Sequence, residues 1–232
     1  MPLPAGLPEF AVSEAAPAHT PVLYLHGFAS SPDSTKARFF GERLHAHGVP
    51  LTAPDFNQPD FATLTLSRML EQLAGHIAHA GGRVTLMGSS LGGALAILAA
   101  ARFGPAVERL VLLAPAVLVS RPGHSLLPPE RIAEWEHRGE LPFSHYAYGE
   151  ERLLHYAFYA DSLRHDPFDA VFNQPTLIFQ GLRDTVVDPR PVEHFSHART
   201  NVTLSLLEDD HQLGASLPRM WSGVEDFLGL LG

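Results

Sequence analysis

The feature that most constrains the fold of this chain is the alternation of short apolar runs with longer amphipathic segments. The apolar runs predict strands at residues 21–26, 49–55, 83–87, 109–113, 176–180 and 202–207. The segments between them predict helices at 31–47, 64–80, 90–103, 192–198 and 217–231. Strands that alternate with helices pair in parallel through right-handed crossovers. We therefore expect an α/β fold with a doubly wound, mostly parallel sheet.

One long interval interrupts this alternation. Between about residues 120 and 170 the sequence has two helical patterns, at 129–138 and 149–164, and no strand pattern. An insertion at the carboxyl edge of a parallel sheet lies where ligands bind. We therefore predict a single domain, residues 1–232, with a helical cap formed by residues 120–170. Residues 1–18, rich in Pro and Ala, predict an extended lead-in.

Composition and charge argue against several classes of protein. The chain has no cysteine, which rules out disulfides, a thiolate nucleophile and thiolate metal sites. Its net charge of −9 and the lack of a basic stripe argue against nucleic-acid binding, which needs clustered cations. No apolar run approaches the roughly 18 residues of a membrane span, and the first residues lack a signal-peptide pattern. We expect a cytoplasmic protein without a membrane or nucleic-acid partner.

The clearest chemical signal is the segment Gly88-Ser89-Ser90-Leu91-Gly92-Gly93, between a predicted strand and a predicted helix. A serine hydroxyl becomes an effective nucleophile when a tight turn exposes it beside a general base. In the pattern G-x-S-x-G, glycines two positions before and after the serine permit that turn, which selects Ser90 rather than Ser89. A glycine-rich turn needed only for packing is the alternative. The strand-turn-helix context favours Ser90 as a nucleophile.

A serine that attacks a carbonyl also needs donors for the negative charge that develops on the oxygen. The backbone N–H of Leu91 begins the predicted helix, where the helix dipole favours negative charge. A second donor is expected from the loop after the first strand, which reads His26-Gly27-Phe28. Gly27 would allow close approach and Phe28 would supply its N–H. Alternatively, His26 and Gly27 simply end a strand.

The hydroxyl further requires an imidazole base and an acid that orients it. In this arrangement the chain order is serine, acid, histidine. Of the fourteen histidines, His211 follows the last predicted strand and precedes the final helix. Asp184 follows the preceding strand and is the favoured acid. Asp188 and Asp210 remain alternatives.

Other clusters have weaker functional interpretations. The helical pairs His76 with His79 and His194 with His197 lack a third ligand at suitable spacing, so we expect no metal site. No cofactor is required either. Seven aromatic residues of the predicted cap could line an acyl or alcohol pocket or could form the cap's own core: Trp135, Phe143, Tyr146, Tyr148, Tyr156, Phe158 and Tyr159.

Together these residues resemble the α/β-hydrolase superfamily. Within it, residues 24–37, Tyr-Leu-His-Gly-Phe-Ala-Ser-Ser-Pro-Asp-Ser-Thr-Lys-Ala, are similar to the opening of the short YqiA/YcfP-type bacterial serine esterases. The resemblance runs from about residue 21 to the end, except in the cap, which looks longer than in the smallest members. It implies nucleophile Ser90, acid Asp184, base His211 and backbone donors at Phe28 and Leu91. The base loop Glu-Asp-Asp-His departs from relatives that have glycines there.

These observations favour hydrolysis of a small-molecule carboxylic ester or thioester through an acyl-enzyme. Two alternatives stay open, because a fold alone does not fix a reaction. The same three side chains could serve a carbon–carbon hydrolase or lyase, or the cavity could belong to a noncatalytic small-molecule binder. A structural scaffold has the least support. The physiological substrate and the oligomeric state are not determined by the sequence.

Overall fold

The computed structural model describes residues 19–119, 121, 124 and 127–231, so the expected lead-in at 1–18 lies outside the described residues. Six strands form the main sheet: β1 (Val22–Leu25), β2 (Leu51–Thr52), β3 (Val84–Ser89), β4 (Val107–Leu113), β7 (Thr176–Gly181) and β8 (Val202–Leu207). They are all parallel, in the order β2-β1-β3-β4-β7-β8. The predicted doubly wound parallel sheet is therefore confirmed.

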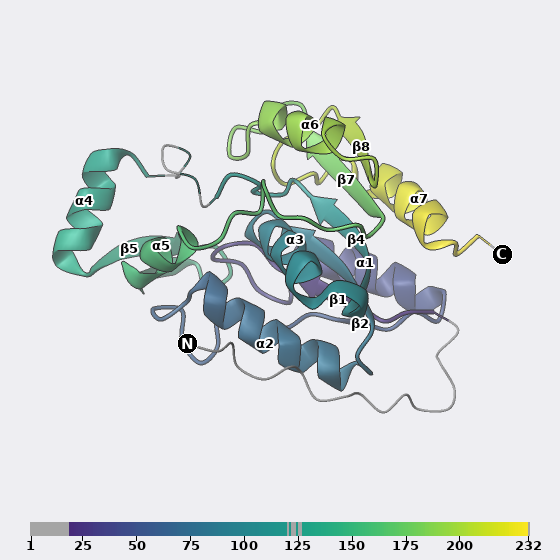
Figure 1. The fold of residues 1–232 in the computed structure, drawn as a ribbon, viewed down its shortest axis with the longest axis horizontal. Helices are drawn as coiled ribbons and strands as arrows, with labels where there is room; N and C mark the ends of the chain where they lie inside the picture. The colour runs from purple at the N-terminus through teal and green to yellow at the C-terminus, as the bar shows by residue number, and fades with distance from the viewer. Residues whose placement is uncertain (1–18, 120, 122–123, 125–126, 232) are drawn as a thin grey trace.

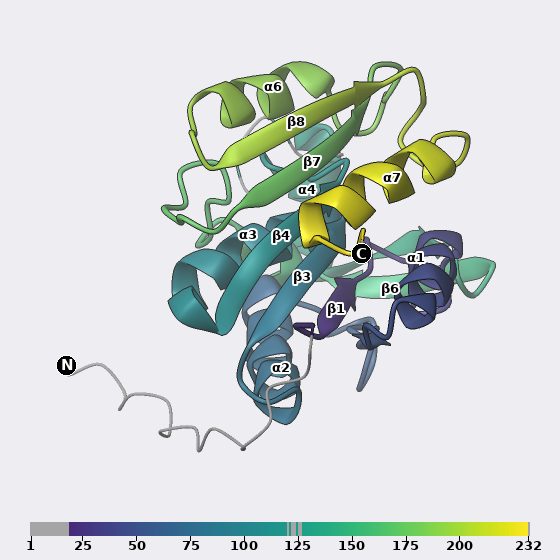
Figure 2. The same cartoon turned by 90° about the vertical axis from the view of Figure 1, so that its right-hand side faces the viewer.

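Helices cover both faces of this sheet (Figures 1 and 2). They are α1 (Thr35–Ala46), α2 (Leu66–His79), α3 (Leu91–Phe103), α6 (Pro189–His197) and α7 (Leu217–Leu228), with a short 3₁₀ helix η1 (Gly104–Ala106). One apolar cluster joins α2, α3 and α6 to the sheet, and a second joins α1 and α7 to it. In β1 the alternating side chains divide between them: Leu23 and Leu25 enter the first, Val22 and Tyr24 the second. Both faces are buried, which explains the continuous apolar runs in the sequence.

The strand order reverses at β1, which lies between β2 and β3. In open α/β sheets, ligands bind beyond the carboxyl ends of the strands at such a reversal. The loop that follows β1 contains Gly27 and Phe28, and the turn that follows β3 contains Ser90. The topology therefore brings the predicted nucleophile and the predicted donor loop to adjacent strand ends.

Several predicted boundaries were wrong: α6 begins at Pro189 rather than at 192, and α7 ends at Leu228 rather than at 231. Helix α1 begins at Thr35 with Ser34 as its N-cap, whereas Ser31 and Pro32 belong to a preceding turn. The Ser34 hydroxyl accepts a hydrogen bond from the Ala37 N–H, as an N-cap should. Strand β2 is also much shorter than the predicted 49–55, because only two of its residues pair with β1.

The cap differs most from expectation. Between β4 and β7 the chain forms α4 (Pro129–Arg138), β5 (Glu140–His145), β6 (Glu150–His155) and α5 (Ala157–Ser162). The helix at 129–138 is confirmed. Of the helix predicted at 149–164 only the second half forms, as α5, whereas residues 150–155 form a strand, so the expected absence of strands was wrong. Strands β5 and β6 form an antiparallel hairpin. Figure 1 shows α4, β5 and α5 together at one end of the molecule.

The physical reason for the hairpin is packing rather than local preference. Residues 150–155 (Glu-Glu-Arg-Leu-Leu-His) include strong helix formers, which made a helix plausible. In the structure Leu154 pairs with Leu141 across the hairpin, and both are buried. The indole N–H of Trp135 donates to the Leu154 carbonyl at 2.7 Å. Tertiary contacts of this kind override propensity.

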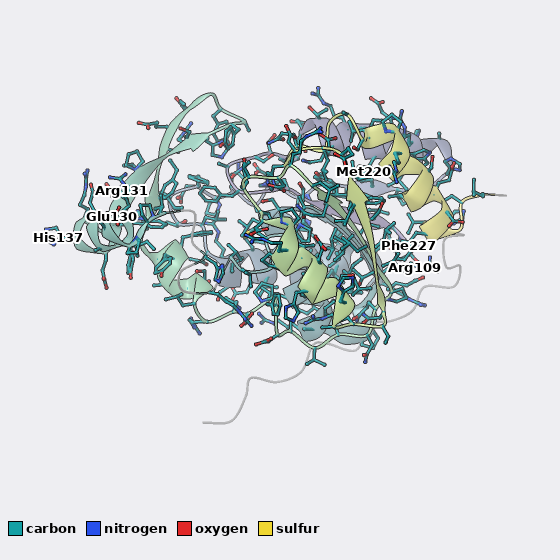
Figure 3. The ribbon with its side chains drawn as sticks, turned by 90° about the horizontal axis from the view of Figure 1, so that it is seen from above. Arg109, Glu130, Arg131, His137, Met220 and Phe227 are labelled. Carbon is teal, nitrogen blue, oxygen red and sulfur yellow. The ribbon has the colours of Figure 1, made fainter. Side chains whose placement is uncertain are left out.

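Helix α4 of the cap and helix α7 lie toward opposite ends of the molecule. Figure 3 shows Glu130, Arg131 and His137 of α4 at one end and Met220 and Phe227 of α7 toward the other. Within the described ranges, no helix is both long and apolar enough to cross a membrane.

The close contact between α3 and β1 gives a test of the fold. A Cβ on Gly92 would lie 2.0 Å from the Leu25 carbonyl oxygen, and backbone cannot yield cheaply. We expect Gly92→Ala to lower the free energy of unfolding by at least about 2 kcal/mol, measured in urea. The matched control is Gly75→Ala in α2, where nothing lies within 4 Å of the added carbon. Gly75→Ala should instead stabilise by about 0.5–1 kcal/mol. Equal effects of the two changes would contradict the packing argument.

Candidate active site

Ser90 is held in a strained turn between β3 and α3. Its backbone has φ 54° and ψ −114°, a conformation that residues other than glycine rarely adopt. The strain is maintained by hydrogen bonds: the Ser90 N–H donates to Leu113 O at 2.9 Å, and the Ser90 carbonyl accepts from Ala116 N at 3.0 Å. A Cβ on Gly88 would lie 2.3 Å from Gly92 O, so the two glycines of the motif pack directly against each other. Strain that persists in this way is typical of functional sites.

Two backbone donors lie beside Ser90. Phe28, Ser90 and Leu91 all line one cavity. Within the described part of the chain, neither the Phe28 N–H nor the Leu91 N–H meets a protein acceptor. Leu91 is the first residue of α3, where the N–H groups have no partner inside the helix. The arrangement suits a negatively charged oxygen formed on a substrate at Ser90.

His26 orients the peptide that carries the Phe28 N–H. Its Nδ1 lies 2.9 Å from the Gly27 carbonyl oxygen, and its Nε2 accepts from the Phe56 N–H at 3.1 Å. Nδ1 therefore carries the proton and donates to Gly27 O. Because the peptide is planar and trans, the Phe28 N–H points opposite to that carbonyl. The buried imidazole thus fixes the direction of the donor, a role that the sequence analysis did not assign.

Asp184 and His211 meet across the loops that follow β7 and β8. The His211 Nδ1 lies 2.8 Å from Asp184 Oδ2, which leaves Nε2 available. The Asp184 side chain is fully buried, whereas that of His211 is 16% exposed. The close approach depends on Gly181, where a Cβ would lie 2.6 Å from the carbonyl oxygens of Asp209 and Asp210.

Four donors surround the Asp184 carboxylate. Oδ1 accepts from the Val186 and Val187 N–H groups at 2.8 Å each, and Oδ2 accepts from Gln180 Nε2 at 3.0 Å as well as from His211. Burial alone would raise the pKa of this carboxyl. The hydrogen bonds from His211 and from the two backbone groups outweigh burial and hold the pKa below its usual value. Asp184 is therefore a carboxylate that can orient and stabilise a protonated imidazole.

The two alternative acids are engaged elsewhere. Asp188 is the N-cap of α6, accepts from the Arg190 N–H at 3.0 Å and pairs with the Arg190 guanidinium. Asp210 is exposed and accepts from the Gln212 N–H at 2.8 Å. Neither has a hydrogen bond to His211 among the described residues. The geometry therefore favours Asp184 as the acid.

No hydrogen bond joins the Ser90 hydroxyl to the His211 ring in the described part of the structure. Catalytic hydrogen bonds are often long or poorly aligned before substrate binds. The structure thus pairs the acid with the base, and the nucleophile with its two donors.

A cavity of about 290 Å³ lies above Ser90, between the core and the cap. Four of the seven cap aromatic residues line it: Trp135, Phe143, Phe158 and Tyr159. Trp135 also contacts the other three rings, so these residues both line a pocket and form part of the cap's own core. Tyr146 and Tyr148 are instead exposed, and Tyr156 packs against Trp135.

The helical histidine pairs do not form a site with other ligands. Among the residues that the structure describes, no group of three or more His, Asp or Glu side chains is placed to hold a metal ion. Gln180, which supports Asp184, was not found from the sequence, since a glutamine at the end of a buried strand carries no recognisable signal.

One family model matches most of the chain. Residues 21–227 match the model of an uncharacterised protein family, UPF0227. The chain belongs to this family. The resemblance to YqiA-type members of the α/β-hydrolase superfamily is thereby confirmed.

Solved structures share the fold across nearly the whole chain. Est1E from Butyrivibrio proteoclasticus, solved with ferulic acid bound, has a TM-score of 0.78 and 23% identity, covering 90% of this chain and 88% of its own. Alpha/beta hydrolase domain-containing protein 10 from mouse has a TM-score of 0.75 and 22% identity, covering 91% and 90%. A monoacylglycerol lipase from Paleococcus ferrophilus has a TM-score of 0.70 and 16% identity, covering 91% and 96%. At these identities the likeness shows the fold.

The hydrogen bond between Asp184 and His211 supplies a test. In Asp184→Asn the amide would disfavour the tautomer with a proton on Nδ1, so kcat on an ester substrate should fall by about 10³–10⁴-fold. Asp188→Asn should cost less than about tenfold, since Asp188 has no bond to His211. Thermal unfolding of both variants controls for loss of fold. A larger loss in Asp188→Asn would assign the acid to Asp188.

Proposed function

We propose that this protein is a serine hydrolase that cleaves a carboxylic ester or thioester through an acyl-enzyme. The observation that carries the proposal is the strained Ser90 at an apolar cavity, beside the Phe28 and Leu91 N–H groups, for which the described residues supply no acceptor. The hydrogen-bonded pair of Asp184 and His211 supplies the remaining chemistry. No cofactor or metal is needed for this reaction.

In the first half of the reaction, the substrate carbonyl binds with its oxygen toward the Phe28 and Leu91 N–H groups. His211 Nε2 takes the proton from the Ser90 hydroxyl as Oγ attacks the carbonyl carbon. Asp184 stabilises the imidazolium and keeps Nδ1 protonated. The tetrahedral oxyanion then collapses, and His211 gives its proton to the departing alcohol or thiol. Ser90 is left acylated.

In the second half, water takes the place of the leaving group. His211 removes a proton from this water, and the hydroxide attacks the acyl carbon of the ester on Ser90. The same two N–H groups bind the second oxyanion. Loss of one such donor typically lowers kcat by about 10²–10³-fold, which indicates how much each N–H group contributes to stabilising the transition state. When this second intermediate collapses, the bond between the acyl carbon and Ser90 Oγ breaks, His211 returns its proton to Oγ, and the carboxylic acid is released.

The comparisons support a hydrolase in general terms. Proteins with this fold include an esterase, a monoacylglycerol lipase and an alpha/beta hydrolase domain-containing protein. One of them, Est1E, was solved with ferulic acid bound. Ferulic acid is a carboxylic acid, and ester hydrolysis also yields a carboxylic acid. The ester or thioester substrate of the present chain is inferred from its own site.

A fluorophosphonate probe tests the nucleophile directly, because only an activated serine reacts with it. The wild-type protein should be labelled at Ser90, and Ser90→Ala should lose both labelling and hydrolysis of aryl acetates. Ser89→Ala is the matched control, since the neighbouring serine lies in the same turn but is buried in β3. It should keep its labelling. Labelling and turnover retained in Ser90→Ala would refute the assignment. A wild-type protein that never reacts would indicate a noncatalytic binder.

A further inference from the structure

The cavity above Ser90 has one aromatic wall. The centroid of the Phe28 ring lies 5.6 Å from that of the Phe143 ring, in an edge-to-face arrangement, and 5.5 Å from that of the Phe158 ring. Trp135 extends this aromatic wall. Its ring centroid lies 5.0 Å from that of Phe143 and 6.5 Å from that of Phe158. The residue whose N–H faces the reacting oxygen therefore anchors its own side chain among the aromatic residues of the cap. Aromatic groups bind well in such surroundings, by offset stacking or by edge contacts.

The rest of the lining is mostly aliphatic and offers few charges. It includes residues from the loops after β4 and β7 and from the start of α6: Val117, Leu118, Val119, Val186, Val187 and Pro191, with His124 and Ser162 as polar members. No lysine or arginine is among the described residues that line the cavity. Asp188 does line it, and hydrogen bonds from Arg190 hold the pKa of this carboxyl below its usual value. An anionic group would therefore meet a carboxylate that already engages the neighbouring Arg190, and no lysine or arginine among the described lining residues.

We propose that this cavity binds the acyl part of the substrate, and that the acyl group is uncharged, apolar and about the size of one aromatic ring with a short linker. The volume of about 290 Å³ lies at the lower end of the range for small-molecule sites. It suits a phenylpropanoyl group better than a long acyl chain. This inference rests on the proposed function.

Ethyl esters separate acyl preference from leaving-group effects, because the ethyl group is constant. The kcat/KM for ethyl 3-phenylpropanoate should exceed that for ethyl acetate by at least tenfold, and monoethyl succinate should be the poorest of the three. Tyr159→Leu removes a ring from the cavity and should lower the phenylpropanoate-to-acetate ratio at least threefold. Tyr146→Leu, at a residue of the cap that is 83% exposed, is the matched control and should leave the ratio unchanged. Hydrolysis of all three esters at similar rates would overturn the acyl assignment while leaving Ser90 as the nucleophile.

Binding can be measured without catalysis. The chain has two tryptophans, Trp135 in the cavity and Trp221 on α7, so Trp221→Phe leaves a single reporter at the site. Neutral 3-phenylpropanamide should change the Trp135 fluorescence saturably, in Ser90→Ala as well, whereas anionic succinamate should not. No saturable change with the neutral amide would overturn the proposal even if esters were never hydrolysed.

A second observation concerns Lys36, which is the one lysine in the sequence. Its Nζ donates to the Gln212 carbonyl at 3.0 Å, across 176 positions of sequence. Gln212 directly follows His211. Lys36 also interacts electrostatically with Asp184, Asp209 and Asp210. The first turn of α1 therefore holds the loop that carries the proposed base.

The charges around His211 explain why a cation is useful there. Asp184 contacts the ring, and Asp209 and Asp210 precede it in the loop. Asp209 is buried and accepts from the Ser216 N–H at 2.9 Å. Glu208 is paired with Arg183, at 3.6 Å, on the exposed side. Carboxylates near an imidazole favour its protonated form, which cannot act as a base.

We infer that Lys36 is a positioning residue: its hydrogen bond to the Gln212 carbonyl anchors the loop that carries His211, and its positive charge offsets the surrounding carboxylates. Burial lowers the pKa of Lys36, and the three carboxylates act in the opposite direction. The inference rests on the proposed function, but part of its test does not depend on activity.

Lys36→Met keeps much of the side-chain length and removes the charge and the donor. The acidic limb of the pH profile of kcat/KM should move upward by at least half a pH unit, and Lys36→Arg should restore it. A purely structural role would lower Tm in Lys36→Met without moving the limb, which would overturn the inference.

An independent readout is ¹³C methylation of amines, which labels only Lys36 and the amino terminus. The Lys36 methyl signal should show a second titration step that disappears in His211→Asn. A Lys36 signal that is unaffected by His211→Asn would also overturn the inference, whether or not the protein hydrolyses esters.

Discussion

The site depends on the contact between the first turn of α3 and the end of β1. Gly92 lies so close to the Leu25 carbonyl that a single added carbon could not fit. This contact places the strained Ser90 next to the loop that begins at His26. The Phe28 and Leu91 N–H groups come from different strand ends, yet both line the same cavity. The backbone contact between Gly92 and Leu25 thus positions the two N–H groups that could stabilise a negatively charged oxygen at Ser90.

The acid–base pair is supported in a different way, by polar groups rather than by packing. Asp184 is fully buried but has hydrogen-bond donors on both of its oxygens. A buried carboxylate is costly without such partners. With them, its negative charge is retained and faces His211. The Lys36 contact with the following residue adds a third element, α1, to the support of this loop.

The cap contributes to the reaction centre as well as covering it. The Phe28 ring packs on Phe143 of β5 and Phe158 of α5. A second connection is polar: the His145 ring lies 3.2 Å from Asn57, whose amide donates to the Ser30 carbonyl in the loop after Phe28. The cavity above Ser90 and the loop that carries the Phe28 N–H therefore share one set of supporting residues.

The sequence by itself determined the parallel α/β fold and Ser90 with its glycines. It also placed Phe28, Leu91, Asp184 and His211 at strand ends. Apolar periodicity, short motifs and the order of elements along the chain can all be read without knowing which segments meet in space. The sequence could not choose decisively between Asp184 and Asp188, since the choice depends on which carboxylate meets the imidazole in space. It also failed at 150–155, where a buried pair of leucines and a tryptophan hydrogen bond stabilise a hairpin against local helical preference. Only the tertiary structure shows which carboxylate meets the His211 ring and that residues 150–155 form a strand, because contacts between distant segments outweigh the preferences of each segment alone.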